Sequence, residues 1–147
     1  MNYEEIRELL NIFLNESGIR QYCVERCGAK CCTGCYDHNE LSCKYYEGEE
    51  GRLTCLASLC DKLCDMLNDL GIQYSFVKIT VFRTVRYHWR PRDIFHHPLP
   101  DEVKKVFEIE NIYVDELRDV LSDGNAYKIR QHLNREMKND YLSAGKI

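Results

Sequence analysis

The chain has 147 residues, of which 44% are hydrophobic and 30% are charged, a balance typical of one globular domain. Its longest uncharged apolar run is far short of the roughly 20 residues of a membrane span, which argues against a membrane partner. The formal net charge of −4 excludes a protein coated all over with basic residues. We therefore expect a single domain over residues 1–147.

Helical periodicity is clear in the first half of the chain. Apolar residues recur at helical spacing from Ile6 to Leu14, and Ser17-Gly18 is a plausible end of that helix. Residues 19–55 show no sustained period and are expected to form a loop-rich segment. Helical spacing returns from Leu56 to Leu70, and Gly71 ends it.

Residues 72–89 fit two structures. Apolar and β-branched residues alternate there as in a strand, yet Val77, Val81 and Val85 are four apart as on a helix. Because the segment is longer than a typical strand, we favour a helix, although periodicity alone leaves both open. Prolines indicate a loop over residues 90–100.

Three short helices are predicted after that loop, over residues 101–110, 113–122 and 126–141. The predicted fold class is therefore mainly α: a small helical domain built around a loop-rich cysteine knot that a metal organises. The metal-binding knot is expected over residues 19–64 and the helical scaffold over residues 72–141.

Cysteine is the most unusual feature of the composition, because all nine cysteines lie within one short segment. They are Cys23, Cys27, Cys31, Cys32, Cys35, Cys43, Cys55, Cys60 and Cys64. The acidic start of the chain lacks the pattern of a secretory signal, so we expect a cytoplasmic location in which thiols stay reduced. An odd number also fits poorly with complete disulfide pairing. The cluster therefore predicts metal binding by these nine cysteines.

Thiolates in groups of four hold Zn²⁺ tetrahedrally at about 2.3 Å or cap the irons of an iron–sulfur cluster. Cys32-Thr-Gly-Cys35 supplies a tight turn, and Cys60 and Cys64 would return ligands from one helical face. The spacing matches neither paired zinc-ribbon knuckles nor the common ferredoxin run. Zinc is the favoured metal, with an iron–sulfur cluster as the alternative, and two sites rather than one are a further alternative.

Part of this pattern resembles a known family. Cys27-Gly28, then Cys31-Cys32, Gly34-Cys35, Cys43 and Cys55 resemble the cysteine-rich zinc- or iron-chelating family of the YkgJ type. The resemblance covers residues 23–64 and departs from the family by an extra residue before the Cys31-Cys32 pair. It implies metal chelation by Cys27, Cys31 or Cys32, Cys35, Cys43, Cys55 and Cys60, and it implies little about a reaction.

Histidines are weaker candidates for metal ligands. His38 follows Cys35 closely and would complete a site of three cysteines and one histidine. His96-His97 lies in the predicted proline-rich loop. Solvated loop histidines are the favoured interpretation of all three.

A basic stretch runs from Lys78 to Arg92 without an acidic residue. Its cations are Lys78, Arg83, Arg86, Arg90 and Arg92, and Phe82, Tyr87 and Trp89 are interleaved with them. Arginines that contact phosphates and aromatics that stack on bases would make a nucleic-acid surface supported by the zinc knot. We favour the alternative that these arginines pair with the acidic helices around residues 101–119.

The sequence does not decide whether the protein is an enzyme. It contains no phosphate-binding glycine loop, no dinucleotide-binding motif, no nucleophile elbow and no His-Glu-x-x-His motif. No catalytic residue, substrate or oligomeric state is assigned. The predicted function is metal binding at a cysteine-ligated zinc site, with a structural or chelating role. The alternatives are an iron–sulfur redox or catalytic protein and a zinc-supported nucleic-acid-binding regulator that uses the basic stretch of residues 78–92.

Overall fold

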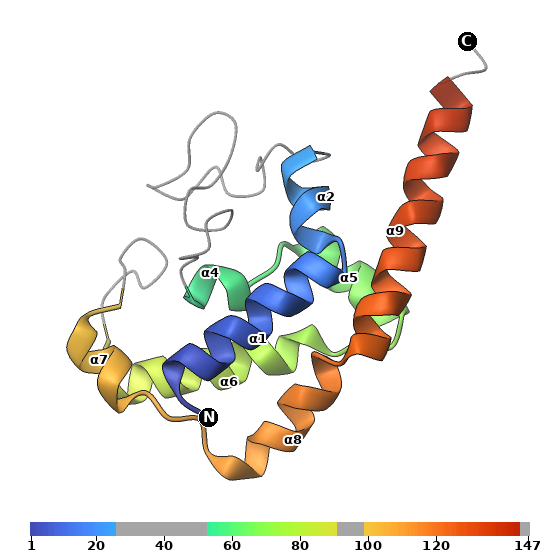
Figure 1. Cartoon of the computed structure of the whole chain (residues 1–147). Coiled ribbons are helices and arrows are strands. Elements are labelled where there is room, and N and C mark those ends of the chain that lie inside the picture. The colour runs from blue at the N-terminus through green and yellow to red at the C-terminus, as the bar shows by residue number, and fades with distance from the viewer. Residues whose placement is uncertain (26–52, 91–98, 145–147) are drawn as a thin grey trace.

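The computed structural model describes residues 1–25, 53–90 and 99–144, and its regular structure is helical (Figure 1). The helices are α1 (Tyr3–Glu16), α2 (Ile19–Glu25), α4 (Leu53–Ala57), α5 (Asp61–Asp69), α6 (Tyr74–His88), α7 (Asp101–Val106), α8 (Asn111–Val120) and α9 (Asp123–Ala144). These ranges contain no strand, only an isolated antiparallel bridge between Asn2 and Glu108. The predicted mainly α fold class is confirmed. None of the helices within these ranges has the length and apolar character needed to cross a membrane.

Helix α1 forms as its sequence predicts. Asn2 accepts a hydrogen bond from the Glu5 backbone N–H at 2.9 Å, and the Glu5 side chain accepts one from the Asn2 N–H, which completes a capping box. Ile6, Leu10 and Phe13 recur along its buried face. The helix therefore begins with a satisfied N-terminus and is held by its apolar stripe.

A glycine turn joins α1 to α2. Gly18 has φ of 82°, a left-handed conformation that costs a residue with a Cβ about 1–2 kcal/mol. The turn lets Ile19 and Tyr22 bury themselves on α2. A helix thus begins within the segment that was expected to be a loop, because two buried residues over seven are too few to produce a periodic signal.

The single helix predicted from Leu56 to Leu70 is two helices. α4 ends at Ala57 and α5 begins at Asp61, because Cys60 has extended backbone angles (φ −65°, ψ 162°) and stands at the N-cap of α5. Apolar residues continue at helical spacing across the break, so the pattern gives no sign of it.

The ambiguous segment 72–89 is helical. Val77, Val81 and Val85 are all fully buried along α6, which is the stripe expected of a helix, while Ile79 is exposed. The three predicted C-terminal helices are also present, as α7, α8 and α9, with their ends shifted by several residues. α7 stops at Val106 because the chain turns extended and buries the Phe107 ring.

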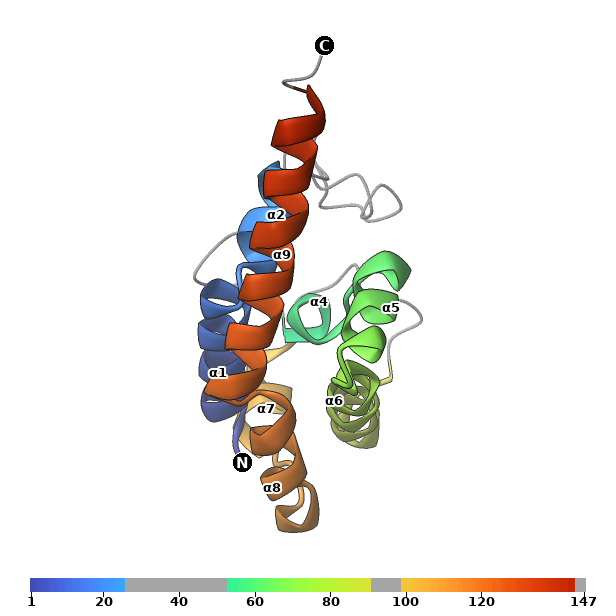
Figure 2. The ribbon, with the colours of Figure 1, turned by 90° about the vertical axis from the view of Figure 1, so that its right-hand side faces the viewer.

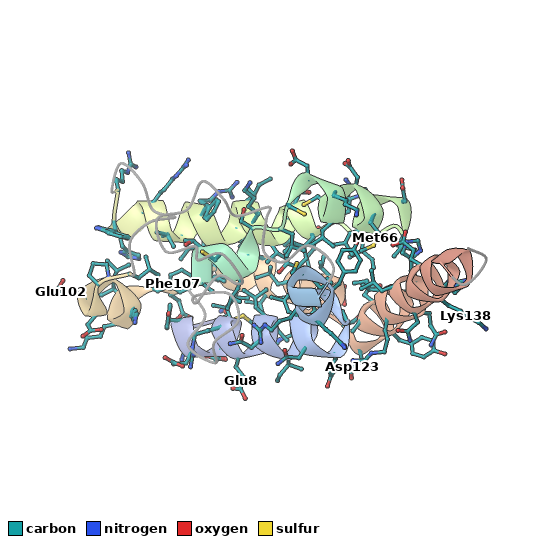
Figure 3. All side chains as sticks on the ribbon, turned by 90° about the horizontal axis from the view of Figure 1, so that it is seen from above. Glu8, Met66, Glu102, Phe107, Asp123 and Lys138 are labelled. Carbon is teal, nitrogen blue, oxygen red and sulfur yellow. The ribbon has the colours of Figure 1, made fainter. Side chains whose placement is uncertain are left out.

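The helices pack in two layers around one core. Figure 2 shows α1 and α9 side by side in one layer, α5 and α6 in the other, and α4 between them. Seen from above, α1 and α6 face each other across the packed side chains, with Glu8 directed outward and Phe107 within the interior (Figure 3). The helices α2 and α4, which flank residues 26–52 in the sequence, and α5 therefore rest on a common scaffold.

Tyr74 joins the layers at the centre. Its side chain is 2% exposed, and its hydroxyl donates a hydrogen bond to the Leu56 carbonyl oxygen at 2.7 Å. Its ring stacks on Phe13, with centroids 6.1 Å apart and planes 20° from parallel. One side chain thus ties α6 to α4 through a hydrogen bond and to α1 through its ring.

Replacing Tyr74 by phenylalanine should lower the free energy of unfolding by about 1–3 kcal/mol, because the buried Leu56 carbonyl loses its phenol donor while the ring contact is kept. Urea denaturation followed by circular dichroism measures the change. The control is Tyr127→Phe on α9, where the side chain is 64% exposed and a change within about 0.5 kcal/mol is expected. Equal effects of the two substitutions would contradict a central role for Tyr74.

Candidate metal centre

The structure describes four of the nine cysteines. Cys23 lies on α2, Cys55 on α4, Cys60 at the N-cap of α5 and Cys64 within α5, and all four are partly buried. The other predicted ligands lie outside the described residues, as do the candidate histidines and one arginine of the basic stretch. They are Cys27, Cys31, Cys32, Cys35, Cys43, His38, His96, His97 and Arg92.

Two of the four described cysteines lie on the helices that flank residues 26–52 in the sequence. α2 ends at Glu25 and α4 begins at Leu53, so Cys23 and Cys55 lie close to the two ends of that range. The Lys62 ammonium lies 5.5 Å from the centre of the Tyr22 ring, which places α5 against α2. The described cysteines are therefore carried by neighbouring helices of one framework.

Cys60 and Cys64 form a pair one helical turn apart. The Cys64 N–H donates to the Cys60 carbonyl at 2.9 Å, the first-turn bond of α5. The Cys64 thiol donates to the Leu59 carbonyl oxygen at 3.5 Å. A thiolate at Cys60 acts on the pKa of Cys64, so the two sulfurs are near neighbours at the start of the helix.

Burial raises the pKa of the Cys64 thiol above its ordinary value, and the negative charge that Cys60 carries as a thiolate raises it further. Asp61 and Asp65 act in the same direction, whereas the Lys78 ammonium lowers it. Cys64 is consequently a protonated thiol at neutral pH unless a stronger cation is placed beside it. The buried Tyr74 phenol also has a raised pKa, first through burial and then through the Cys64 charge.

The described cysteines do not make a complete site. In the part of the chain that the structure describes, no three side chains of His, Cys, Asp or Glu lie close enough together to hold a metal ion. A four-ligand site that used Cys60 and Cys64 would need ligands from outside the described ranges. The metal ligand set therefore stays a prediction.

The sequence pattern did not indicate that Tyr74 and Lys78 would lie near Cys64. Tyr74 and Lys78 come from α6, and both interact electrostatically with Cys64 on α5. Their four-residue spacing places them on one face of α6, but only the packing of α6 against α5 brings that face to the cysteine.

The basic stretch does not form one surface. Lys78 and Arg83 are five residues apart on α6, so they point about 140° apart around its axis. Lys78 acts on Cys64, and its ammonium lies 5.8 Å from the centre of the Phe82 ring. Phe82 is buried and Trp89 is partly buried against the core, so Tyr87, 83% exposed, is the one of the three interleaved aromatics that faces solvent.

For the described arginines, the predicted pairing with the acidic helices around residues 101–119 is wrong. Arg83 does reach α8, but it donates a hydrogen bond to the Tyr113 hydroxyl at 3.0 Å and lies over the Tyr113 ring. Within residues 53–90 and 99–144, no carboxylate forms an ion pair with Arg83, Arg86 or Arg90.

No family model, curated protein or solved structure matches the chain. Its function is therefore inferred from its own residues and their arrangement.

Cys64 in the metal-free protein should react with iodoacetamide only at unusually high pH, because the thiolate is the reactive form and its pKa is raised. The measurement is the pH profile of Cys64 alkylation, followed by peptide mass spectrometry after EDTA treatment. The midpoint should lie above the value of about 8.5 for a free cysteine and should fall to it in urea.

Two substitutions should shift the alkylation midpoint in opposite directions. Lys78→Met removes the cation that lowers the pKa and should move the midpoint up, whereas Asp65→Asn removes a nearby negative charge and should move it down. The midpoint, unlike the rate itself, is insensitive to how accessible the sulfur is. A profile that is the same in folded and unfolded protein would refute this environment for Cys64.

Proposed function

We propose that the chain is a metal-binding protein in which clustered cysteines hold zinc in a structural or chelating role. The observation that carries the proposal is the cluster itself: nine cysteines lie between Cys23 and Cys64, and the rest of the chain has none. We also propose a cytoplasmic location, and few other uses exist for so many thiols at short spacing in that reducing compartment.

The Cys60–Cys64 pair supports this proposal by its geometry. Ligands at positions i and i+4 of a helix reach one metal ion from the same side, as two histidines do in helical zinc motifs. Cys60 is the N-cap of α5 and its carbonyl accepts the first-turn hydrogen bond from the Cys64 N–H, so this bond fixes the backbone spacing of the pair. Two ligands held in this way lose little freedom when a metal binds.

The charges around Cys64 also support a cation at this position. Thiolates at Cys60 and Cys64 would stand beside Asp61 and Asp65, with Lys78 as the opposing charge that acts on Cys64. A divalent ion is a stronger local charge than one ammonium and deprotonates a coordinating thiol outright. Metal binding would therefore release protons from the site.

The helical framework limits what the metal has to organise. Leu53, Leu56 and Leu63, from the helices that carry Cys55, Cys60 and Cys64, are buried in the main core. The scaffold thus has hydrophobic burial of its own, and the metal would order the cysteine-rich segment upon it. The resemblance of residues 23–64 to the chelating YkgJ-type family agrees with this role.

Elemental analysis of protein purified without oxygen, together with its visible spectrum, tests the proposal directly. We expect one or two zinc ions per chain and no colour, since d¹⁰ zinc has no visible transition. A brown preparation with iron and acid-labile sulfide would replace zinc by an iron–sulfur cluster. Protein without metal would refute the proposal.

Serine at position 60 or 64 should weaken zinc retention by at least about 100-fold, because losing a ligand costs more than losing the 10- to 100-fold contribution of its supporting contacts. Transfer of zinc to a chromogenic chelator measures the effect. The matched control is Met66→Leu on the same helix, which removes a partly buried sulfur but no thiol. Equal zinc retention in Cys60→Ser, Cys64→Ser and Met66→Leu would show that this pair holds no metal.

Removing zinc should lower amide-exchange protection between Cys23 and Cys64 and leave it unchanged in α1 and α6, whose buried stripes do not depend on the metal. Hydrogen exchange followed by mass spectrometry before and after chelation makes the comparison. Unchanged protection between Cys23 and Cys64 would contradict an organising role for the metal.

A further inference from the structure

A second surface lies on α6, away from the cysteines. Ile79, Arg83, Arg86 and Tyr87 fall within about one third of the circumference of the helix, opposite the buried valines. The Nε–H of Arg90 donates to the Arg86 carbonyl oxygen at 3.0 Å, which holds that fifth side chain beside the same turn. We call these residues the arginine face: Ile79, Arg83, Arg86, Tyr87 and Arg90.

The arginine face is positive within an acidic protein. α6 contains no aspartate or glutamate, although the chain as a whole has a net charge of −4. None of its three arginines forms an ion pair with a carboxylate in the described ranges. Favourable interaction with the C-terminal end of the helix dipole explains a cation in the last turn, such as Arg86, but not Arg83 near the middle. The uncompensated charge is complementary to a polyanion.

The exposed Arg83 side chain is held in place by Tyr113 on α8. Its guanidinium donates to the Tyr113 hydroxyl at 3.0 Å and lies 5.6 Å from the centre of that ring. The Tyr113 ring in turn meets Phe76 edge-on, with centroids 6.2 Å apart. This contact uses part of the guanidinium and leaves further N–H donors of the fork for an incoming phosphate.

Tyr87 distinguishes this face from a merely basic helix. The side chain is 83% exposed, and its ring lies nearly perpendicular to the neighbouring His88 ring, with centroids 5.0 Å apart. An exposed aromatic between arginines is the arrangement that binds unpaired bases, which stack on the ring while cations contact the backbone. A duplex keeps its bases stacked inside and offers such a ring no comparable contact.

We propose that the arginine face of α6 binds single-stranded nucleic acid, with Arg83, Arg86 and Arg90 on phosphates and Tyr87 stacked on a base. Arg83 and Arg86 are about 4.5 Å apart along the axis of α6 and Arg90 follows the end of the helix, so the three arginines suit about three phosphates of a strand. Contact with so few phosphates is weak and does not require the metal, so this proposal stands or fails separately from the zinc site.

Fluorescence anisotropy of a labelled ten-nucleotide oligothymidylate, titrated with the full-length metal-loaded protein, tests the proposal. Contacts with about three phosphates predict that log K falls with log salt with a slope of about −2 between about 50 and 200 mM. Each of Arg83→Ala, Arg86→Ala and Arg90→Ala should reduce that slope by about 0.7, and Arg83→Lys should restore it. Zinc content and circular dichroism of each variant verify that the fold is intact.

Tyr87→Ala separates stacking from charge. It should weaken binding between about fivefold and a hundredfold and leave the salt slope unchanged, because it removes a base contact and no cation. The matched control is Arg135→Ala on α9, an exposed helical arginine whose Nε–H also donates to the carbonyl four residues earlier. That substitution should change neither affinity nor slope.

Three results would overturn the proposal. The first is no binding at about 50 mM salt. The second is equal affinity for a duplex of the same length with no effect of Tyr87→Ala, which would indicate phosphate contacts alone. The third is tighter binding to vesicles of phosphatidylcholine and phosphatidylserine than to the oligonucleotide, which would make the face a membrane-surface contact.

Discussion

The hydrogen bond from the Tyr74 hydroxyl to the Leu56 carbonyl is the constraint on which the arrangement of the cysteine-bearing helices depends. A phenol that is almost completely buried must find an acceptor, because leaving its O–H unsatisfied would cost several kcal/mol. The acceptor is on α4, a helix too short to be stable in isolation. Stacking of the same ring on Phe13 extends the connection to α1. Tyr74 therefore fixes where α4 lies, and with it the direction in which the chain enters α5.

The same buried phenol affects the electrostatics of the candidate metal centre. The negative charge of a Cys64 thiolate raises the pKa of Tyr74, and both groups have raised pKa values, chiefly through burial. Without metal, the Tyr74 phenol and the Cys64 thiol are therefore both neutral and can stay buried without an uncompensated charge. The proposed metal ion would change that balance at Cys64 by supplying the positive charge that ionisation lacks. Burial and metal affinity are thus opposed at this cysteine, and Lys78 offsets part of the cost.

Helices with a sustained apolar stripe could be predicted from the sequence, whereas breaks between them could not. The stripes of α1 and α6 repeat often enough to identify both helices, and for α6 the buried valines decide between helix and strand. The break at Cys60 is invisible because Leu59 and Leu63 continue the helical spacing across it. The chain leaves α4 and changes direction before α5, and this change depends on how the helices pack, which no local sequence pattern shows.

The candidate sites show the same division between composition and arrangement. The density of cysteine predicts the kind of ligand, but membership of one site depends on which helices become neighbours, as Tyr74 and Lys78 beside Cys64 illustrate. The basic stretch is continuous in sequence only. Helical geometry directs Lys78 towards the cysteines and Arg83 towards solvent. The two side chains diverge from one helix that is packed along its length. A metal ion bound near Lys78 and an anion bound at Arg83 would therefore occupy separate sites on one rigid helix.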